Sequence, residues 1–185
     1  MDQSLFHLLN AVWTNDFFDV IIPFWRNKYF WLPLYSFILF FIFYNYKQKA
    51  YWFIICLIAC VGSADLLSSK IVKEYVQRVR PCNNESINDV RNLVHCGSGY
   101  SFTSNHSANH FAISFFLLLT LANQFKKLKW PLILWAISIA YSQVYVGVHF
   151  PLDVISGAIL GVLTARLFVW LYCMVDEGIP EFCSS

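Results

Sequence analysis

The sequence predicts an all-α membrane protein, a polytopic helix bundle with five to six spans and an N-terminal interfacial helix. Composition is one reason: 58% of the 185 residues are hydrophobic and only 13% are charged. A soluble domain of this size could not bury so much apolar surface. The second reason is that uncharged runs of 18 to 19 residues recur along the chain, which is about the length of a helix that crosses a bilayer.

We expect one membrane-spanning helix from each of five apolar segments: Tyr29–Tyr46, Ala50–Val72, Ser107–Phe125, Trp130–Val148 and Val154–Val175. Asp65 lies inside the second segment, where a carboxylate needs a polar partner, and a hydrogen bond between helices is the expected explanation. Arg166 interrupts the last segment, and its long side chain can extend to the membrane interface.

The N-terminal segment Leu5–Trp25 is shorter, and Asn15, Asp16 and Asp19 interrupt its apolar pattern. We expect a helix that lies on the membrane interface, with a sixth span as the alternative. No cationic region precedes an apolar core, so the segment does not resemble a cleaved signal peptide.

No long linker, repeat or low-complexity tract divides the chain. We expect three parts: an N-terminal segment (1–28), a membrane domain (29–175) and a short C-terminal tail (176–185). The net charge is only +2, and no basic stripe is present, so a nucleic-acid partner is not expected. The bilayer is the expected partner, and the oligomeric state is not indicated.

Lysines indicate how the chain is oriented in the membrane. One short loop contains Lys47 and Lys49, and a second contains Lys126, Lys127 and Lys129. Two expected spans separate these loops along the chain, so both loops lie on the same face of the membrane. The positive-inside rule places this shared face in the cytoplasm. The loop 73–105 and the corner near His149 then share the outer face. We expect a membrane protein whose unusual polar residues face outward.

Two of the six cysteines, Cys82 and Cys96, lie in this outer loop. An oxidising compartment would allow them to form a disulfide near Arg80. The alternative is a pair of reduced thiols.

The first polar block is Lys73-x6-Arg80-Pro81. Residues seven apart lie about two helical turns from each other, so Lys73 and Arg80 are expected on one helix face, with the helix ending at Pro81. A guanidinium fork and a compact ammonium both bind phosphate oxygens.

The second block, Ser104-Asn105-His106, opens an apolar helix, where Ser and Asn are common N-caps and free backbone N–H groups favour anions. A cap does not require the imidazole of His106.

In the third block, His149 and Asp153 are spaced i, i+4. We expect the carboxylate to hold one imidazole nitrogen and leave the other free as a nucleophile. A surface His–Asp pair that caps a helix is the alternative.

Together the blocks resemble the three-part signature of the type 2 phosphatidic acid phosphatase superfamily, a family of integral membrane lipid phosphatases. That signature is Lys-x6-Arg-Pro, then Pro-Ser-Gly-His, then Ser-Arg-x5-His-x3-Asp. The first part is intact here, the second reads Thr103-Ser104-Asn105-His106, and the third reads Ser142-Gln143-x5-His149-x3-Asp153. The resemblance covers roughly residues 29–175 and is specific.

The resemblance implies roles for individual residues. His149 would be the nucleophile and form a phosphohistidine, with Asp153 orienting it. His106 would protonate the leaving group and then act as a base towards water. The phosphate-binding residues would be Lys73, Arg80, Ser104, Asn105 and Gln143. No cofactor or metal is implied.

Gln143 departs from the family, which usually has arginine there as a third cation on the phosphate. Either Arg78 or Asn105 supplies the missing donor, or the protein is a degenerate, non-catalytic lipid-phosphate-binding member. We favour an active enzyme because the other polar groups are retained. Undecaprenyl pyrophosphate is the preferred substrate, because a compact chain offers little structure for a large head group.

A metal site is a third possibility, because His106 and His110 form an i, i+4 pair and His149 could join them. The pattern lacks the glutamate of a zincin, and the nearby Lys73 and Arg80 would repel a cation. We therefore expect no metal.

Overall fold

The fold is seen in a computed structural model that describes residues 1–87, 89–121 and 125–175, and every regular element in these ranges is helical. The long helices are α3 (Leu32–Tyr46), α4 (Lys49–Leu66), α6 (Asn105–Leu121), α7 (Lys129–Tyr145) and α8 (Pro151–Val175). The shorter elements are α1 (Asp2–His7), α2 (Asp16–Trp25), α5 (Lys73–Val76), the π-helical turns Leu8–Val12 and Leu67–Val72, and the 3-10 turns Pro81–Asn83 and Lys126–Leu128.

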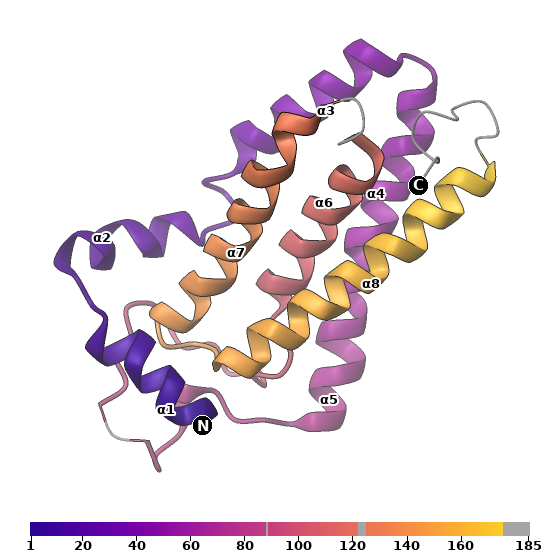
Figure 1. Cartoon of the computed structure of the whole chain (residues 1–185). Helices are drawn as coiled ribbons and strands as arrows, with labels where there is room; N and C mark the ends of the chain where they lie inside the picture. The colour runs from indigo at the N-terminus through magenta and orange to yellow at the C-terminus, as the bar shows by residue number, and fades with distance from the viewer. Residues whose placement is uncertain (88, 122–124, 176–185) are drawn as a thin grey trace.

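Helix α6 lies at the centre of the bundle and packs against α4, α7 and α8 (Figure 1). Its closest partner is α8, because Gly157 and Gly161 allow the two backbones to approach. A Cβ added at Gly161 would lie 2.3 Å from the carbonyl oxygen of Ala108. Small residues four apart are a common basis for close helix contacts in membranes.

Among the described residues, two stretches are long and apolar enough to cross a membrane: Lys49–Asn83, whose continuous helical part ends at Val76, and Pro151–Val175. The apolar helix Leu32–Tyr46 is shorter. The all-helical architecture agrees with the predicted bundle. The count of five to six spans stays a prediction.

The N-terminal segment forms two helices where one was expected. Asn15 separates them, because its side-chain oxygen accepts a hydrogen bond from the Phe17 amide at 2.8 Å and so caps α2. The ten residues of α2 extend about 15 Å, roughly half the hydrocarbon thickness of a bilayer. Each of the two helices alone is shorter than a membrane span, and the alternative sixth span stays a prediction.

The expectation that Lys73 and Arg80 share a helix face, and that Pro81 ends this helix, is wrong. Helix α5 ends at Val76, and Gln77 adopts the left-handed conformation with φ 50°. Arg80 is extended, as is usual before a proline, and Pro81 begins a separate 3-10 turn. The chain therefore turns away from the helix before it reaches Arg80.

The predicted helix–helix partner of Asp65 is confirmed. Its carboxylate accepts hydrogen bonds from the side-chain amides of Asn105 at 3.0 Å and Asn109 at 2.9 Å. These bonds connect α4 to the start of α6, next to the second polar block.

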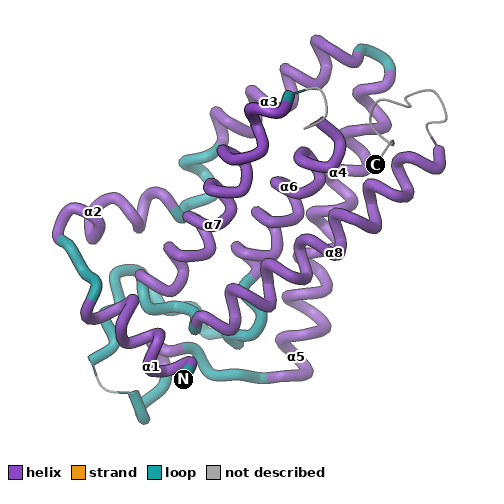
Figure 2. The backbone as a smooth tube through the Cα atoms, in the orientation of Figure 1, coloured by secondary structure: helices purple, strands orange, loops and turns teal. Residues whose placement is uncertain are grey.

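The loops after α5 and after α7 lie at the same end of the bundle (Figure 2). A disulfide joins Cys82 to Cys96, with their Cα atoms 6.0 Å apart. Gly147 has φ 86°, and a Cβ there would lie 2.5 Å from the carbonyl oxygen of Arg91. Because only glycine fits this close approach, the long loop can pack onto the corner before His149.

Candidate active site

A cavity of about 360 Å³ opens at this end of the bundle. It is lined by residues from four parts of the chain: Arg26, Ser69, Lys73, Arg80, His95, Gly97, Asn105, His106, Val148 and His149. Four of the residues expected to act on a phosphate, Lys73, Arg80, His106 and His149, therefore surround one space. No aspartate or glutamate is among the lining residues.

His149 is buried and is held from one side. Its Nδ1 lies 3.6 Å from Asp153 Oδ2 and 3.3 Å from the hydroxyl of Ser101. Ser101 in turn donates a short hydrogen bond to the same carboxylate oxygen. With Nδ1 directed at these oxygen atoms, it carries the proton, and the lone pair is on Nε2.

Asp153 is placed by the first turn of α8 and not by a shared helix face. The helix begins at Pro151, so His149 precedes it, and Asp153 Oδ2 accepts a hydrogen bond from the Phe150 amide at 2.8 Å. This is the backbone contact that a third-position carboxylate makes in a capping box. The other carboxylate oxygen accepts a hydrogen bond from Arg78 at 2.7 Å.

His149 lies in the corner between α7 and α8, outside both helices. Burial lowers its pKa to about 4, and the nearby Asp153 carboxylate opposes this shift. The imidazole is therefore neutral near pH 7, which is the form that can attack phosphorus.

The cationic groups reach the cavity from separate segments. Arg80 donates from Nε to the Gly99 carbonyl at 2.8 Å, and its Nη1 lies 3.4 Å from the Val148 carbonyl. Within residues 1–87, 89–121 and 125–175, the Lys73 ammonium makes no hydrogen bond or ion pair, so its three donors are available. These charges suit a multiply charged phosphate oxyanion.

His110, the second histidine of the possible metal pair, has protein partners at both ring nitrogens. His110 lies 2.8 Å through Nδ1 from the His106 carbonyl oxygen and 3.2 Å through Nε2 from the Tyr35 hydroxyl. Both ring nitrogens of His110 are thus engaged. Of these two histidines, His106 is the one that lines the cavity.

The remaining predicted phosphate ligands lie at the edge of the cavity or behind it. Asn105 lines it, but its amide already binds Ser68 at 2.9 Å and Asp65 at 3.0 Å. Ser104 and Gln143 are fully buried and are not lining residues. The amide of Ser104 donates to the Asp153 carbonyl at 3.0 Å, which ties the start of α6 to α8.

Arg78 does not replace the missing family arginine. Its guanidinium binds Asp153 on one side and Asp2 at 2.5 Å on the other, and it stacks 3.9 Å from the Phe150 ring. Asp2 also accepts a hydrogen bond from the Leu152 amide at 3.0 Å. Arg78 therefore supports the carboxylate behind His149.

Three residues at the site were missed by the sequence analysis: Arg26, Ser101 and the supporting Asp2. None lies in a motif, and each meets its partner across a long separation, 117 residues for Arg26 and Gln143. The one available signal was the position of Arg26, a cation directly after an apolar segment expected at the interface.

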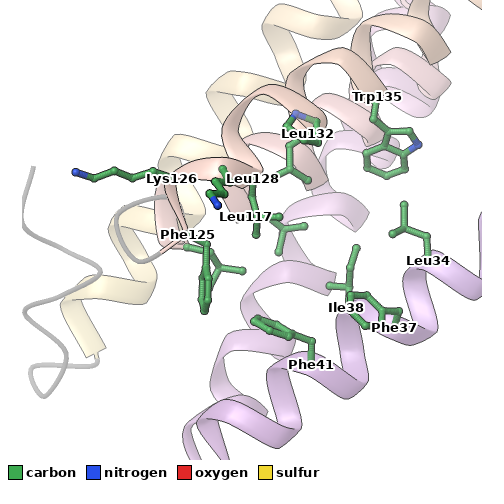
Figure 3. Close-up of a pocket in the computed structure, with 13 residues that line it drawn as sticks. Leu34, Phe37, Ile38, Phe41, Leu117, Phe125, Lys126, Leu128, Leu132 and Trp135 are labelled. Carbon is green, nitrogen blue, oxygen red and sulfur yellow. The ribbon is translucent and has the colours of Figure 1, made fainter.

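A larger cavity, of about 680 Å³, lies between α3, α6 and α7 (Figure 3). Its walls are almost entirely apolar, and it begins at the Lys126–Leu128 turn. Leu121, which lines it, is roughly 22 Å along α6 from His106. None of the residues predicted to act on a phosphate lines the larger cavity, so the smaller cavity is the candidate site.

Several known proteins with similar sequences are phosphatases. The lipid A 4'-phosphatase of Bacteroides thetaiotaomicron is 28% identical over 177 residues, which cover 92% of this chain and 76% of that protein. The undecaprenyl-diphosphatase of Sulfolobus acidocaldarius is 30% identical over 161 residues, or 85% of this chain and 72% of that protein.

A solved structure and a family model give the same result. The PAP2-type phosphatidylglycerolphosphate phosphatase from Bacillus subtilis has a TM-score of 0.71 and 28% identity, covering 98% of this chain and 87% of that one. The sequence model of the PAP2 superfamily matches residues 53–176, which include all three polar blocks. The chain belongs to the PAP2 superfamily.

Proposed function

We propose that this protein is a membrane phosphatase that hydrolyses a lipid phosphate or pyrophosphate through a phosphohistidine on His149. The observation that carries the proposal is the arrangement around His149. Its Nδ1 faces the Ser101–Asp153 pair, and the residue lines a cationic cavity. A neutral imidazole with one free nitrogen is a competent nucleophile.

In the first step, Nε2 of His149 attacks the phosphorus atom, and the bond from phosphorus to the lipid-side oxygen breaks. His106, in its imidazolium form, gives a proton to that leaving oxygen and becomes neutral. Lys73 and Arg80 neutralise the phosphoryl oxygens as the bonds change, and this electrostatic stabilisation lowers the barrier. The imidazolium of His149 is stabilised by Asp153.

In the second step, water attacks the phosphohistidine, and His106 accepts a proton from that water. The bond from phosphorus to Nε2 breaks, which releases inorganic phosphate and returns neutral His149. Fixed cations perform the charge neutralisation here, so we propose that no metal ion is needed.

Undecaprenyl pyrophosphate is our preferred substrate, because the compact loops leave little structure to bind a large head group. A lipid A 4'-phosphate is the second candidate. It is favoured by the 92% of this chain that aligns with a relative of that name. We further propose a bacterial inner-membrane location with the cavity on the outer face, since the lysine-containing loops lie at the other end of the bundle.

The test is phosphate release by the purified protein in detergent with EDTA. The panel is undecaprenyl pyrophosphate, a lipid A phosphate, phosphatidylglycerol phosphate and phosphatidate. We expect turnover that survives EDTA and is lost in His149→Ala. With a substrate labelled at phosphorus, quenched enzyme should retain label that is stable in alkali and released by acid, as expected for a phosphoramidate.

The control is His95→Ala, which removes another imidazole from the cavity wall but leaves the proposed nucleophile and acid. Turnover by His149→Ala equal to that of the parent protein would refute the phosphohistidine step. Absence of turnover with every lipid would favour the non-catalytic, lipid-phosphate-binding alternative.

A further inference from the structure

We propose that Arg26, at the end of α2, is a phosphate-binding residue of this site, and that Gln143 is the positioning residue that holds it there. The inference rests on the proposed function, which makes the cavity a phosphate site. It adds a residue that lies outside the matched region 53–176 and outside every motif.

Arg26 lines the cavity together with Lys73, Arg80, His106 and His149. Its Nη2 donates to the side-chain oxygen of Gln143 at 3.1 Å. Its Nε is buried and has no hydrogen-bond partner among the residues that the structure describes. A buried guanidinium donor is seldom left unpaired, so an unpaired one on a cavity wall indicates that an anion completes the arrangement.

The charge of Arg26 is not neutralised by the protein. Within the described parts of the chain, Arg26 makes no ion pair, unlike Arg78 and Arg91, which bind aspartates. Burial, with Arg80 nearby, lowers the pKa of Arg26 to about 10. The guanidinium therefore remains charged at neutral pH and gives the cavity a third cation beside Lys73 and Arg80.

The end of α2 is fixed on α7 by aromatic contacts. Trp25 donates from its indole to Ser138 at 2.9 Å, and the Trp31 indole donates to the Trp25 carbonyl at 2.7 Å. The Trp31 ring also contacts the Trp135 ring, with centroids 5.5 Å apart. Because these contacts fix both sides of the turn, Arg26 is held over Gln143 and does not extend into solvent.

Gln143 suits this role because its amide oxygen accepts a hydrogen bond without neutralising the guanidinium. Its amide nitrogen lies 3.3 Å from Ser142 Oγ and 3.5 Å from the Ile139 carbonyl, which orients the oxygen towards Arg26. The glutamine that departs from the family pattern is thus the group that places the replacement cation.

The experiment compares Arg26→Gln, Arg26→Lys, Gln143→Glu and the double variant Arg26→Gln/Gln143→Arg. Lys28→Gln is the matched control, since it removes an exposed cation two residues away that does not line the cavity. For each protein, kcat and KM are measured on a lipid phosphate that the parent hydrolyses. Orthovanadate binding is measured by calorimetry, and thermal unfolding reports on folding.

We expect Arg26→Gln to lower kcat/KM and vanadate affinity about 10- to 100-fold, the effect of losing a charged hydrogen bond. Arg26→Lys should retain part of the activity. Gln143→Glu should weaken binding because its carboxylate neutralises Arg26, and the double variant should recover activity because it restores a guanidinium. Lys28→Gln should match the parent.

Parent-like kcat/KM and vanadate affinity in Arg26→Gln would overturn the inference while leaving the phosphatase proposal intact. A loss that follows a lower unfolding temperature, and that neither Arg26→Lys nor the double variant reverses, would also overturn it. If the parent hydrolyses no lipid, the proposed function fails, and vanadate binding by parent and Arg26→Gln still tests Arg26.

Discussion

Ser101 is the residue that connects His149, the proposed nucleophile, to the Asp153 carboxylate. Its hydroxyl lies 3.3 Å from His149 Nδ1 and donates to Asp153, while Nδ1 and the carboxylate are 3.6 Å apart. This geometry is a relay in which the hydroxyl accepts from one partner and donates to the other. The orientation of the imidazole therefore depends on a side chain outside the motifs.

We expect Ser101→Ala to lower kcat about 10- to 100-fold with a small change in KM, because one buried hydrogen bond is lost without removing a phosphate contact. Steady-state kinetics on the preferred lipid measures this. Ser114→Ala is the matched control, since the Ser114 hydroxyl is buried in α6 without a partner. Equal kcat values for Ser101→Ala and Ser114→Ala would contradict the relay.

The protonation of His149 gives a second residue-level prediction. Because burial lowers its pKa to about 4, the folded protein should keep this imidazole neutral down to about pH 4. Between about pH 6.5 and 4 the unfolded chain binds this proton and the folded chain does not, so stability should fall as the pH falls through that window.

NMR of protein labelled with 15N-histidine checks this, with His149→Gln identifying the signal. We expect the imidazole signal assigned to His149 to stay that of the neutral form between pH 5 and 8. A His149 titration centred near pH 6.5 would contradict the prediction.

The sequence predicted which types of residue form the site better than it predicted which of these residues contact one another. The sequence placed His149 and Asp153 four apart, and the structure does bring them together. The sequence could not indicate the contact between Arg26 and Gln143, since the two residues are 117 positions apart and meet only through the packing of α2 on α7. A pairing set by tertiary packing leaves no spacing pattern along the chain.

At the level of elements, the contact between α6 and α8 determines where His106 lies relative to Asp153. A Cβ on Gly157 would lie 2.5 Å from the Ser104 carbonyl oxygen, and one on Gly161 would lie 2.3 Å from that of Ala108. Both clashes are with backbone, which cannot rotate away as a side chain can. The helices would have to separate.

We expect Gly161→Ala to destabilise the protein by about 1–3 kcal/mol, the usual range for overpacking, and to lower kcat because His106 moves with α6. Thermal unfolding in detergent and steady-state kinetics measure the two effects. Gly62→Ala in α4 is the control, because a Cβ there meets nothing within 4 Å. Parent-like stability of Gly161→Ala would contradict the proposed close contact.

The apolar runs of the sequence predicted where the helices lie, but local polar contacts determine where each helix begins and ends. Helix α3 starts at Leu32 with Pro33 in its first turn, close to the expected Tyr29. Helix α7 stops at Tyr145 and not at Val148, since the amides of Val148 and His149 turn back to the Gln143 carbonyl. Such turns depend on the next helix and are not visible in hydropathy alone.

For the whole molecule, the N-terminal segment closes the site end of the bundle. Asn10 binds the carbonyls of Arg91 and Tyr145 at 2.9 and 2.7 Å, and Asp19 forms an ion pair with Arg91. Asp2 joins the same surface through Arg78. The segment that was expected to lie on the membrane interface therefore covers the long loop, and its end places Arg26 at the wall of the cavity.

Two features at opposite ends of the molecule indicate the same orientation. Lysine-containing loops favour the cytoplasm, and the Cys82–Cys96 disulfide near the site needs an oxidising compartment. In intact bacterial cells, an impermeant reductant followed by an impermeant maleimide should label the parent but not Cys82→Ser/Cys96→Ser. Lys127→Cys, added to that double variant, should label only after lysis. Labelling of Lys127→Cys in intact cells, with none at Cys82 and Cys96, would instead place the site in the cytoplasm.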